Sequence, residues 1–147
     1  MVSPILLIAV VAWAAAQALK LLISIAVYRK IDMTYLVTGG GMPSSHSSLV
    51  TAAAVSCGIC SGFDSTVFAV AAVLAFIVMY DAAHVRRETG EQSKVLNYIM
   101  HNWAEYRPED YERDLKELIG HTPLQVIIGG IFGAVVGLIG GFIVYGF

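Results

Sequence analysis

The chain has 147 residues, of which 57% are hydrophobic and only 14% are charged, and its mean hydropathy is +0.72. Soluble domains usually carry about 25% charged residues, so this composition excludes an ordinary soluble domain and predicts an integral membrane protein. The formal net charge of −2 indicates no nucleic-acid partner.

The first apolar segment, residues 3–27, is long enough to cross a bilayer, which takes about 20 apolar residues. It lacks the charged start and short apolar core of a cleaved signal peptide. It contains Gln17 and Lys20, and a lysine at the bilayer centre costs about 2.5–3.5 kcal/mol. Lys20 is therefore either a residue that snorkels toward the segment's end or a cation that faces the interior of a helix bundle.

A polar loop follows at residues 28–45 and ends in the run Gly39-Gly40-Gly41-Met42-Pro43-Ser44-Ser45. The second apolar segment, residues 46–62, is rich in Ala, Val and Ser and suits a helix surrounded by other helices. Its Cys57 and Cys60 have the spacing of a redox pair, although small packing residues are the simpler explanation in a membrane helix. The third segment, residues 66–80, is strongly apolar.

The charged part of the chain is an insertion at residues 84–121, between the third and fourth apolar segments. Within it, residues 92–103 show helical spacing of the apolar residues Val95, Leu96, Ile99 and Trp103. This pattern predicts a helix that lies on the membrane interface. A second short helix is expected from Pro108, because proline suits the first turn of a helix, to Gly120.

The fourth apolar segment, residues 123–147, carries a regular stripe of glycines at positions Gly129, Gly133, Gly137 and Gly141. Glycines four residues apart lie on one helix face and let another backbone approach closely. The partner is either another helix of this chain or a second copy in a homo-oligomer, and a structural protein that assembles through this face is one hypothesis.

Four spans place the loops after the first and third segments on the same side. These loops hold eight basic residues, namely Arg29, Lys30, Arg86, Arg87, Lys94, Arg107, Arg113 and Lys116. The termini and the turn at residues 61–65 hold none, so the positive-inside rule predicts cytoplasmic loops with both termini outside. The expected fold is an all-α membrane protein with one domain, residues 1–147, in which about four transmembrane helices carry an interfacial helical insertion.

Two histidines, His46 and His121, each stand at the start of an apolar helix on this cytoplasmic face. Helix N-termini bind anions through their free N–H groups, and Thr122-Pro123 is a good start for the last helix. Arginine forks match phosphate geometry, which suggests a phosphate site with the cations Lys20, Arg29, Arg86 and Arg87. One histidine could attack phosphorus while the other acts as general acid, and neither role needs a metal or cofactor.

Each of these residues also has a simpler explanation. A histidine at a helix start is often only a cap, Arg86 and Arg87 could be topology anchors, and Asp81 could merely pair with one of the arginines. Their occurrence together at one membrane face is what favours a functional site.

Three stretches resemble the divergent branch of the type 2 phosphatidic acid phosphatase (PAP2) family, which is related to acid phosphatases and vanadium-dependent haloperoxidases. They are GGMPSSHS at 40–47, YDAAHVRR at 80–87 and GHTPLQV at 120–126. In order and spacing they cover nearly the whole chain. The resemblance implies a membrane phosphatase.

The family's motifs imply roles for individual residues. The first, a lysine followed after six intervening residues by Arg-Pro, corresponds to Lys20 and Arg29 with a longer spacing and with no proline after Arg29. In the second, Ser44 would bind phosphate and His46 would protonate the leaving group, with Ser45 in place of the family's glycine. In the third, His121 would be the nucleophile, and Arg87 precedes it by 34 positions rather than six because of the insertion.

One departure concerns the aspartate that orients the family's nucleophile, because Gln125 stands in its place. Its amide oxygen could accept a hydrogen bond from the His121 ring, as an asparagine does in some triads, but it would not stabilise an imidazolium. Asp81 is a candidate substitute carboxylate. His84 stands where a small residue is expected in this branch, and no role follows for it.

The sequence therefore predicts a metal-independent phosphatase that hydrolyses a lipid phosphate monoester or diphosphate through a phosphohistidine on His121. Phosphatidate, phosphatidylglycerophosphate and prenyl diphosphates are all candidate substrates. The alternative is a non-catalytic protein that binds or transports a lipid phosphate in the same pocket.

Overall fold

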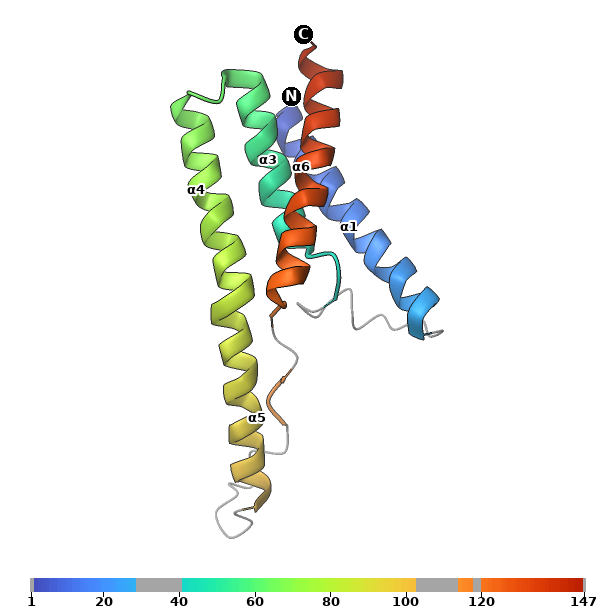
Figure 1. The fold of residues 1–147 in the computed structure, drawn as a ribbon, viewed down its shortest axis with the longest axis vertical. Coiled ribbons are helices and arrows are strands. Elements are labelled where there is room, and N and C mark those ends of the chain that lie inside the picture. The colour runs from blue at the N-terminus through green and yellow to red at the C-terminus, as the bar shows by residue number, and fades with distance from the viewer. Residues whose placement is uncertain (1, 29–40, 103–113, 118–119, 147) are drawn as a thin grey trace.

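The structure, a computed structural model, describes residues 2–28, 41–102, 114–117 and 120–146. The described secondary structure is helical throughout, in the order α1 (Pro4–Tyr28), α3 (Ser45–Ser61), α4 (Thr66–Tyr80), η1 (Asp81–Val85), α5 (Arg86–Asn102) and α6 (Pro123–Tyr145). Figure 1 shows α1, α3, α4 and α6 as a bundle, with α5 extending beyond it and both termini at the opposite end. The predicted all-α class is confirmed.

Three described stretches are long and apolar enough to cross a membrane, namely Pro4–Ala26, Thr66–Asn102 and Pro123–Tyr145. Their outer faces expose large apolar side chains, such as Val70, Phe76 and Ile143, as expected for surfaces that contact lipid. The start and end of α1, α3, α4 and α6 each fall within two residues of the predicted apolar segments.

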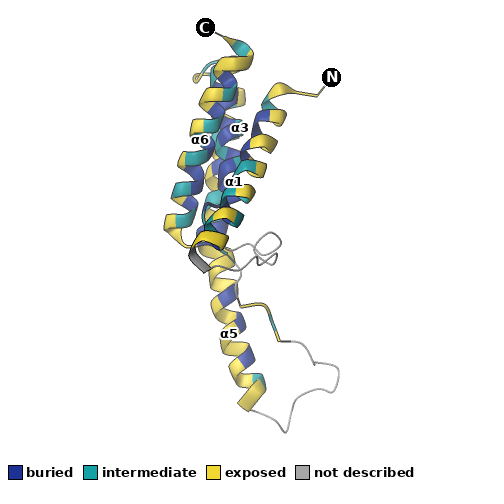
Figure 2. Cartoon of the chain, turned by 90° about the vertical axis from the view of Figure 1, so that its right-hand side faces the viewer, coloured by how far each residue is buried: buried dark blue, intermediate teal, exposed yellow. Residues whose placement is uncertain are grey.

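The helix α3 has 17 residues and lies between α1, α4 and α6. Figure 2 shows buried residues along α3. Most of them are alanines and serines. This position explains its weakly apolar composition, because a helix enclosed by protein needs small residues for packing more than it needs apolar surface for lipid.

The glycine stripe of α6 packs directly on α3, and the two helices run in the same direction. A Cβ atom at Gly129, Gly133 or Gly137 would approach backbone atoms of the α3 segment to less than 3.0 Å. The Ser48 and Ser56 hydroxyls lie 2.9 and 3.4 Å from carbonyl oxygens of α6. The partner of the stripe is therefore a helix of the same chain, and a second copy could not reach these glycines without displacing α3.

The rod formed by α4, η1 and α5 is continuous over the 37 residues Thr66–Asn102. The apolar pattern at residues 92–103 predicted a helix on the interface; the segment is helical through Asn102, but α5 continues the axis of α4 instead of turning aside (Figures 1 and 2). At 1.5 Å per residue the rod is about 55 Å long, which exceeds the roughly 30 Å of a bilayer core. If α4 spans the core, α5 projects out of it.

The short helix expected from Pro108 to Gly120 falls mostly outside the described residues. Its described part, residues 114–117, is not helical and runs beside α5. Hydrogen bonds between Asn97 of α5 and the backbone of Leu115 hold these residues in this course.

The glycine packing predicts different effects for two neighbouring substitutions. A Cβ at Gly133 would collide with the Ser48 backbone and the Thr51 hydroxyl, whereas one at Gly130 would meet the flexible end of Met79 at 3.0 Å. Both alanines add about 1 kcal/mol of helix propensity, so their difference isolates the packing. We expect overpacking in Gly133→Ala to cost about 1–3 kcal/mol and Gly130→Ala to be neutral or stabilising. Thermal unfolding in detergent, followed by circular dichroism, measures both, and equal stabilities would contradict the close α3–α6 contact.

Candidate functional site

Two helix N-termini meet at the end of the bundle that lies opposite the chain termini. Ser44 is the N-cap of α3 and Thr122 is the N-cap of α6. The Ser44 N–H donates to the Gln125 carbonyl at 3.2 Å, which ties the start of α3 to the first turn of α6. The starts of α3 and α6 lie at this same end (Figure 1). His46, in the first turn of α3, and His121, just before the N-cap of α6, therefore lie there too.

The backbone of His121 is held by the widened turn η1. In this π-helical turn the Arg86 N–H reaches back five residues to the Asp81 carbonyl, and the neighbouring Ala82 carbonyl accepts the His121 N–H at 3.0 Å. Gly120 has a φ of +102°, and a Cβ there would approach the backbone of Arg86 and Arg87 to 3.0 Å or less. Only glycine permits this approach, so Gly120 and η1 together place His121.

The His121 imidazole is buried, with 3% of the residue exposed, and neither ring nitrogen has a hydrogen-bond partner among the described residues. Burial, and secondarily the charge of Lys20, lower the pKa of His121 to about 4; the neighbouring Gln125 side chain and Gly41 backbone oppose this shift in part. At neutral pH the imidazole is therefore uncharged, and one ring nitrogen carries a free lone pair.

Lys20 faces the interior of the bundle, with 4% of the residue exposed. A Cβ at Gly41 would lie 3.0 Å from Cδ and 3.1 Å from Cγ of Lys20, so the end of the polar loop packs on the lysine stem. The Lys20 charge acts on both His46 and His121. The burial of Lys20 therefore agrees with a cation that faces the interior of the bundle and not with a lysine that snorkels to the end of the segment.

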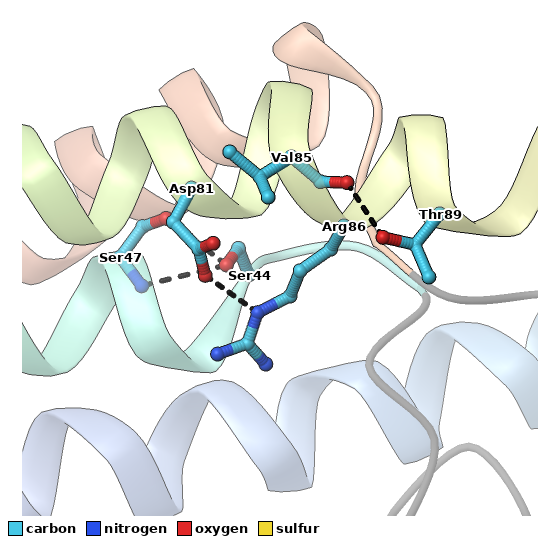
Figure 3. A network of polar contacts seen from close by, with 6 residues as sticks. All are labelled: Ser44, Ser47, Asp81, Val85, Arg86 and Thr89. Atoms are coloured by element: carbon cyan, nitrogen blue, oxygen red, sulfur yellow. Dashed lines mark hydrogen bonds and ion pairs between the residues drawn. The ribbon is translucent and has the colours of Figure 1, made fainter.

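A second cation, Arg86, borders the site from the rod. Its Nε lies 2.6 Å from Asp81 Oδ2, and Figure 3 shows both side chains pointing toward the start of α3, where Ser44 and Ser47 lie. The charges of Arg86 and Asp81 both act on His46, which is exposed in the first turn of α3. Asp81 therefore pairs with Arg86 and does not orient His121.

The serines at the start of α3 are buried and partly occupied. The Ser44 hydroxyl oxygen accepts the Ser47 N–H at 3.4 Å and the Ser47 hydroxyl at 3.0 Å. Ser44 is fully buried and Ser45 nearly so. The Ser44 hydroxyl therefore caps the first turn of α3.

Gln125 has a structural partner. Its Oε1 accepts the Thr122 N–H at 3.0 Å, and the Thr122 hydroxyl oxygen accepts the Gln125 N–H at 3.4 Å. This is the reciprocal capping box of a helix start. The spacing of Thr122 and Gln125 is the sequence signature of such a capping box.

Two further residues, Arg87 and His84, are exposed. Arg87 is exposed and contributes its backbone to the contact with Gly120, and Arg29 lies outside the described residues. His84 is exposed and stacks on Tyr80, with ring centroids 4.5 Å apart. Within the described residues, no group of three or more His, Cys, Asp and Glu side chains is arranged to hold a metal ion.

The His121 environment predicts its titration. NMR of histidine-labelled protein should show one imidazole, absent in His121→Gln, that stays neutral down to about pH 4, while an unfolded histidine titrates at 6.5. The unfolded state then binds a proton that the folded state does not, so the stability contributed by neutral His121 is present above pH 6.5 and is lost as the pH falls to about 4. Lys20→Met should raise the midpoint only in part, because burial is the larger cause. A midpoint near 6.5 in the wild type would contradict the buried placement.

The chain has recognisable relatives. A sequence model described as "Divergent PAP2 family" matches residues 1–136, a range that contains Lys20, His46 and His121. The "Uncharacterized membrane protein YuiD" of Bacillus subtilis (strain 168) is 39% identical over 134 residues, which are 84% of this chain and 85% of the relative. No solved structure matches the chain. The apolar helices and these matches agree on a membrane protein, and the chain belongs to the divergent PAP2 family.

Proposed function

We propose that this protein is a membrane phosphatase that hydrolyses a lipid phosphate monoester or diphosphate. The observation that carries the proposal is the buried, uncharged imidazole of His121 at the end of the bundle where Lys20, His46 and Arg86 also lie. A nucleophile needs a free lone pair, and a phosphoryl group needs nearby positive charge. Membership of the divergent PAP2 family supports the same chemistry.

In the first step a ring nitrogen of His121 attacks phosphorus. The N–P bond forms as the ester P–O bond breaks, and protonated His46 gives its proton to the leaving oxygen. Lys20, Arg86 and the free N–H groups of the two helix starts stabilise the charge on the phosphoryl oxygens. The Ser44 hydroxyl, together with Ser45, Arg87 and Arg29, supplies the remaining candidates for these oxygens.

In the second step neutral His46 takes a proton from water, and the water oxygen attacks phosphorus. The N–P bond breaks, His121 returns to its neutral form and inorganic phosphate leaves. The lipid chain stays in the bilayer beside the apolar faces of the spans throughout. Phosphatidate, phosphatidylglycerophosphate and prenyl diphosphates share the phosphoryl group that this site would hold.

Purified protein in detergent is expected to release phosphate from at least one of these lipids. His121→Ala should abolish release, because it removes the ring nitrogen that attacks phosphorus, and His46→Ala should slow it by about 100- to 10,000-fold. His84→Ala is the matched control, since His84 is exposed and stacked on Tyr80, and it should keep wild-type activity. Unchanged release in both site variants would exclude the histidine mechanism.

One observation favours the alternative of a lipid-phosphate binding or transport protein. No carboxylate among the described residues orients His121, because the family's aspartate is replaced by Gln125, which caps α6, and Asp81 pairs with Arg86. A site without that carboxylate still offers Lys20, Arg86 and two helix starts to an anion. Binding of a lipid phosphate that is lost in Lys20→Met, without phosphate release from any substrate, would establish this alternative in place of the phosphatase.

The excess of basic residues in the loops supports a site on the cytoplasmic side with both termini outside. A thiol-reactive, membrane-impermeant label tests this in a Cys57→Ala, Cys60→Ala background. Glu91→Cys, on exposed α5, should react only from the cytoplasmic side, and Phe63→Cys, in the exposed turn at the other end, only from outside. The reverse pattern would overturn the proposed orientation while leaving the phosphatase proposal intact.

A further inference from the structure

The returning segment, residues 114–117, runs beside α5, and the side chain of Asn97 joins it to that helix. Asn97 is buried, with 5% of the residue exposed. Its Oδ1 accepts the Leu115 N–H at 2.9 Å, and its Nδ2 donates to the Leu115 carbonyl at 3.0 Å and to Glu117 Oε1 at 2.9 Å. The Asn97 amide thus pairs with both polar groups of one residue, as a neighbouring β-strand would.

This pairing fixes the register of the returning segment. A slip of one residue would present neither the N–H nor the carbonyl of Leu115 to Asn97, so both hydrogen bonds would be lost together. A buried amide left unpaired costs far more than an exposed one. The other contact near this point, between His101 and Asp114 at 3.1 Å, joins side chains that are 52% and 58% exposed, and such exposed pairs contribute little.

The register matters because the next anchors follow within a few residues. Gly120 packs on the backbone of Arg86 and Arg87, and His121 bonds to Ala82. Asn97 lies eleven residues along the helix from Arg86, which corresponds to about 16 Å. The five residues from Leu115 to Gly120 can span at most about 17 Å. Holding Leu115 on Asn97 therefore leaves Gly120, and with it His121, little freedom to move.

We propose that Asn97 is a positioning residue for His121: its amide holds the returning segment at Leu115, so that the imidazole is kept at the start of α3. The side chain acts through the backbone of the insertion and has no contact with substrate. Its effect on catalysis rests on the proposed function, whereas its effect on the placement of His121 does not.

The first test compares Asn97→Ala with Asn102→Ala. Asn102 lies on the same helix, is exposed, and donates to the Tyr98 carbonyl within α5 at 2.8 Å. Asn102→Ala therefore removes the same kind of side chain from α5 without touching residues 114–117. In Asn97→Ala we expect faster amide hydrogen exchange at residues 114–121, and a His121 titration midpoint that moves from about 4 toward 6.5. Asn102→Ala should leave both unchanged.

In the phosphatase assay Asn97→Ala should lower kcat by about 10- to 100-fold with little change in KM, because small misplacements of a reacting group have effects of this size. Unchanged exchange and titration in Asn97→Ala would overturn the positioning role, whatever the activity. If the wild type releases no phosphate, the proposed function fails, and exchange and titration still decide the role of Asn97.

A second pair of variants guards against loss of folding. Asn97→Asp keeps the acceptor for the Leu115 N–H but sets a carboxylate against the Leu115 carbonyl and Glu117. It should mimic Asn97→Ala in exchange and titration. Adding Glu117→Gln to Asn97→Asp places an amide donor opposite the new carboxylate, so the His121 titration midpoint should return toward 4. Glu117→Gln alone should have little effect. Absence of rescue in the double variant would contradict the proposed pairing.

Discussion

The close approach of two parallel backbones, α3 and α6, is the constraint on which the candidate site depends. The glycine stripe allows it, because a side chain at Gly129 or Gly133 would collide with the start of α3. Parallel packing places two helix N-termini side by side, and each carries about half a positive charge. Two such ends repel one another, and Lys20 adds a buried cation nearby. An anion at this end of the bundle would relieve all three charges at once, which is the physical basis of the phosphate site proposed here.

The same positive field accounts for the state of His121. Burial and the Lys20 charge keep its imidazole neutral, which suits attack on phosphorus. A bound phosphate dianion would partly offset that field and so make the developing imidazolium less costly. In this scheme the substrate supplies negative charge that an orienting carboxylate supplies in other histidine-dependent sites. Gln125 is then free to serve the capping box that fixes the start of α6.

The features that the sequence predicted are those set by local pattern. Apolar runs predicted the spans. The number of spans between His46 and His121 then predicted that both histidines lie at the same end of the bundle. The glycine stripe predicted a close contact but not its partner, because a second copy and α3 satisfy the same pattern. Gln125 could have been assigned from its spacing to Thr122. The tie between Asn97 and Leu115 joins residues 18 positions apart, and no local period encodes such a contact. The Asp81–Arg86 pair is local, but the sequence alone did not decide between Arg86 and Arg87 as the partner.

The amphipathic pattern of α5 predicted a helix at a surface. It did not predict the direction in which this helix runs. Its apolar residues Val95 and Leu96 stay exposed, while the face formed by Gly90, Ser93 and Asn97 is buried. Apolar burial is non-directional and would tolerate several positions of the returning segment. Paired hydrogen bonds from one buried amide accept only one register. His121 lies beside two helix ends and a buried lysine, and a fixed register keeps it there. The buried polar face of α5 is the one that contacts Leu115, in the segment that leads to His121.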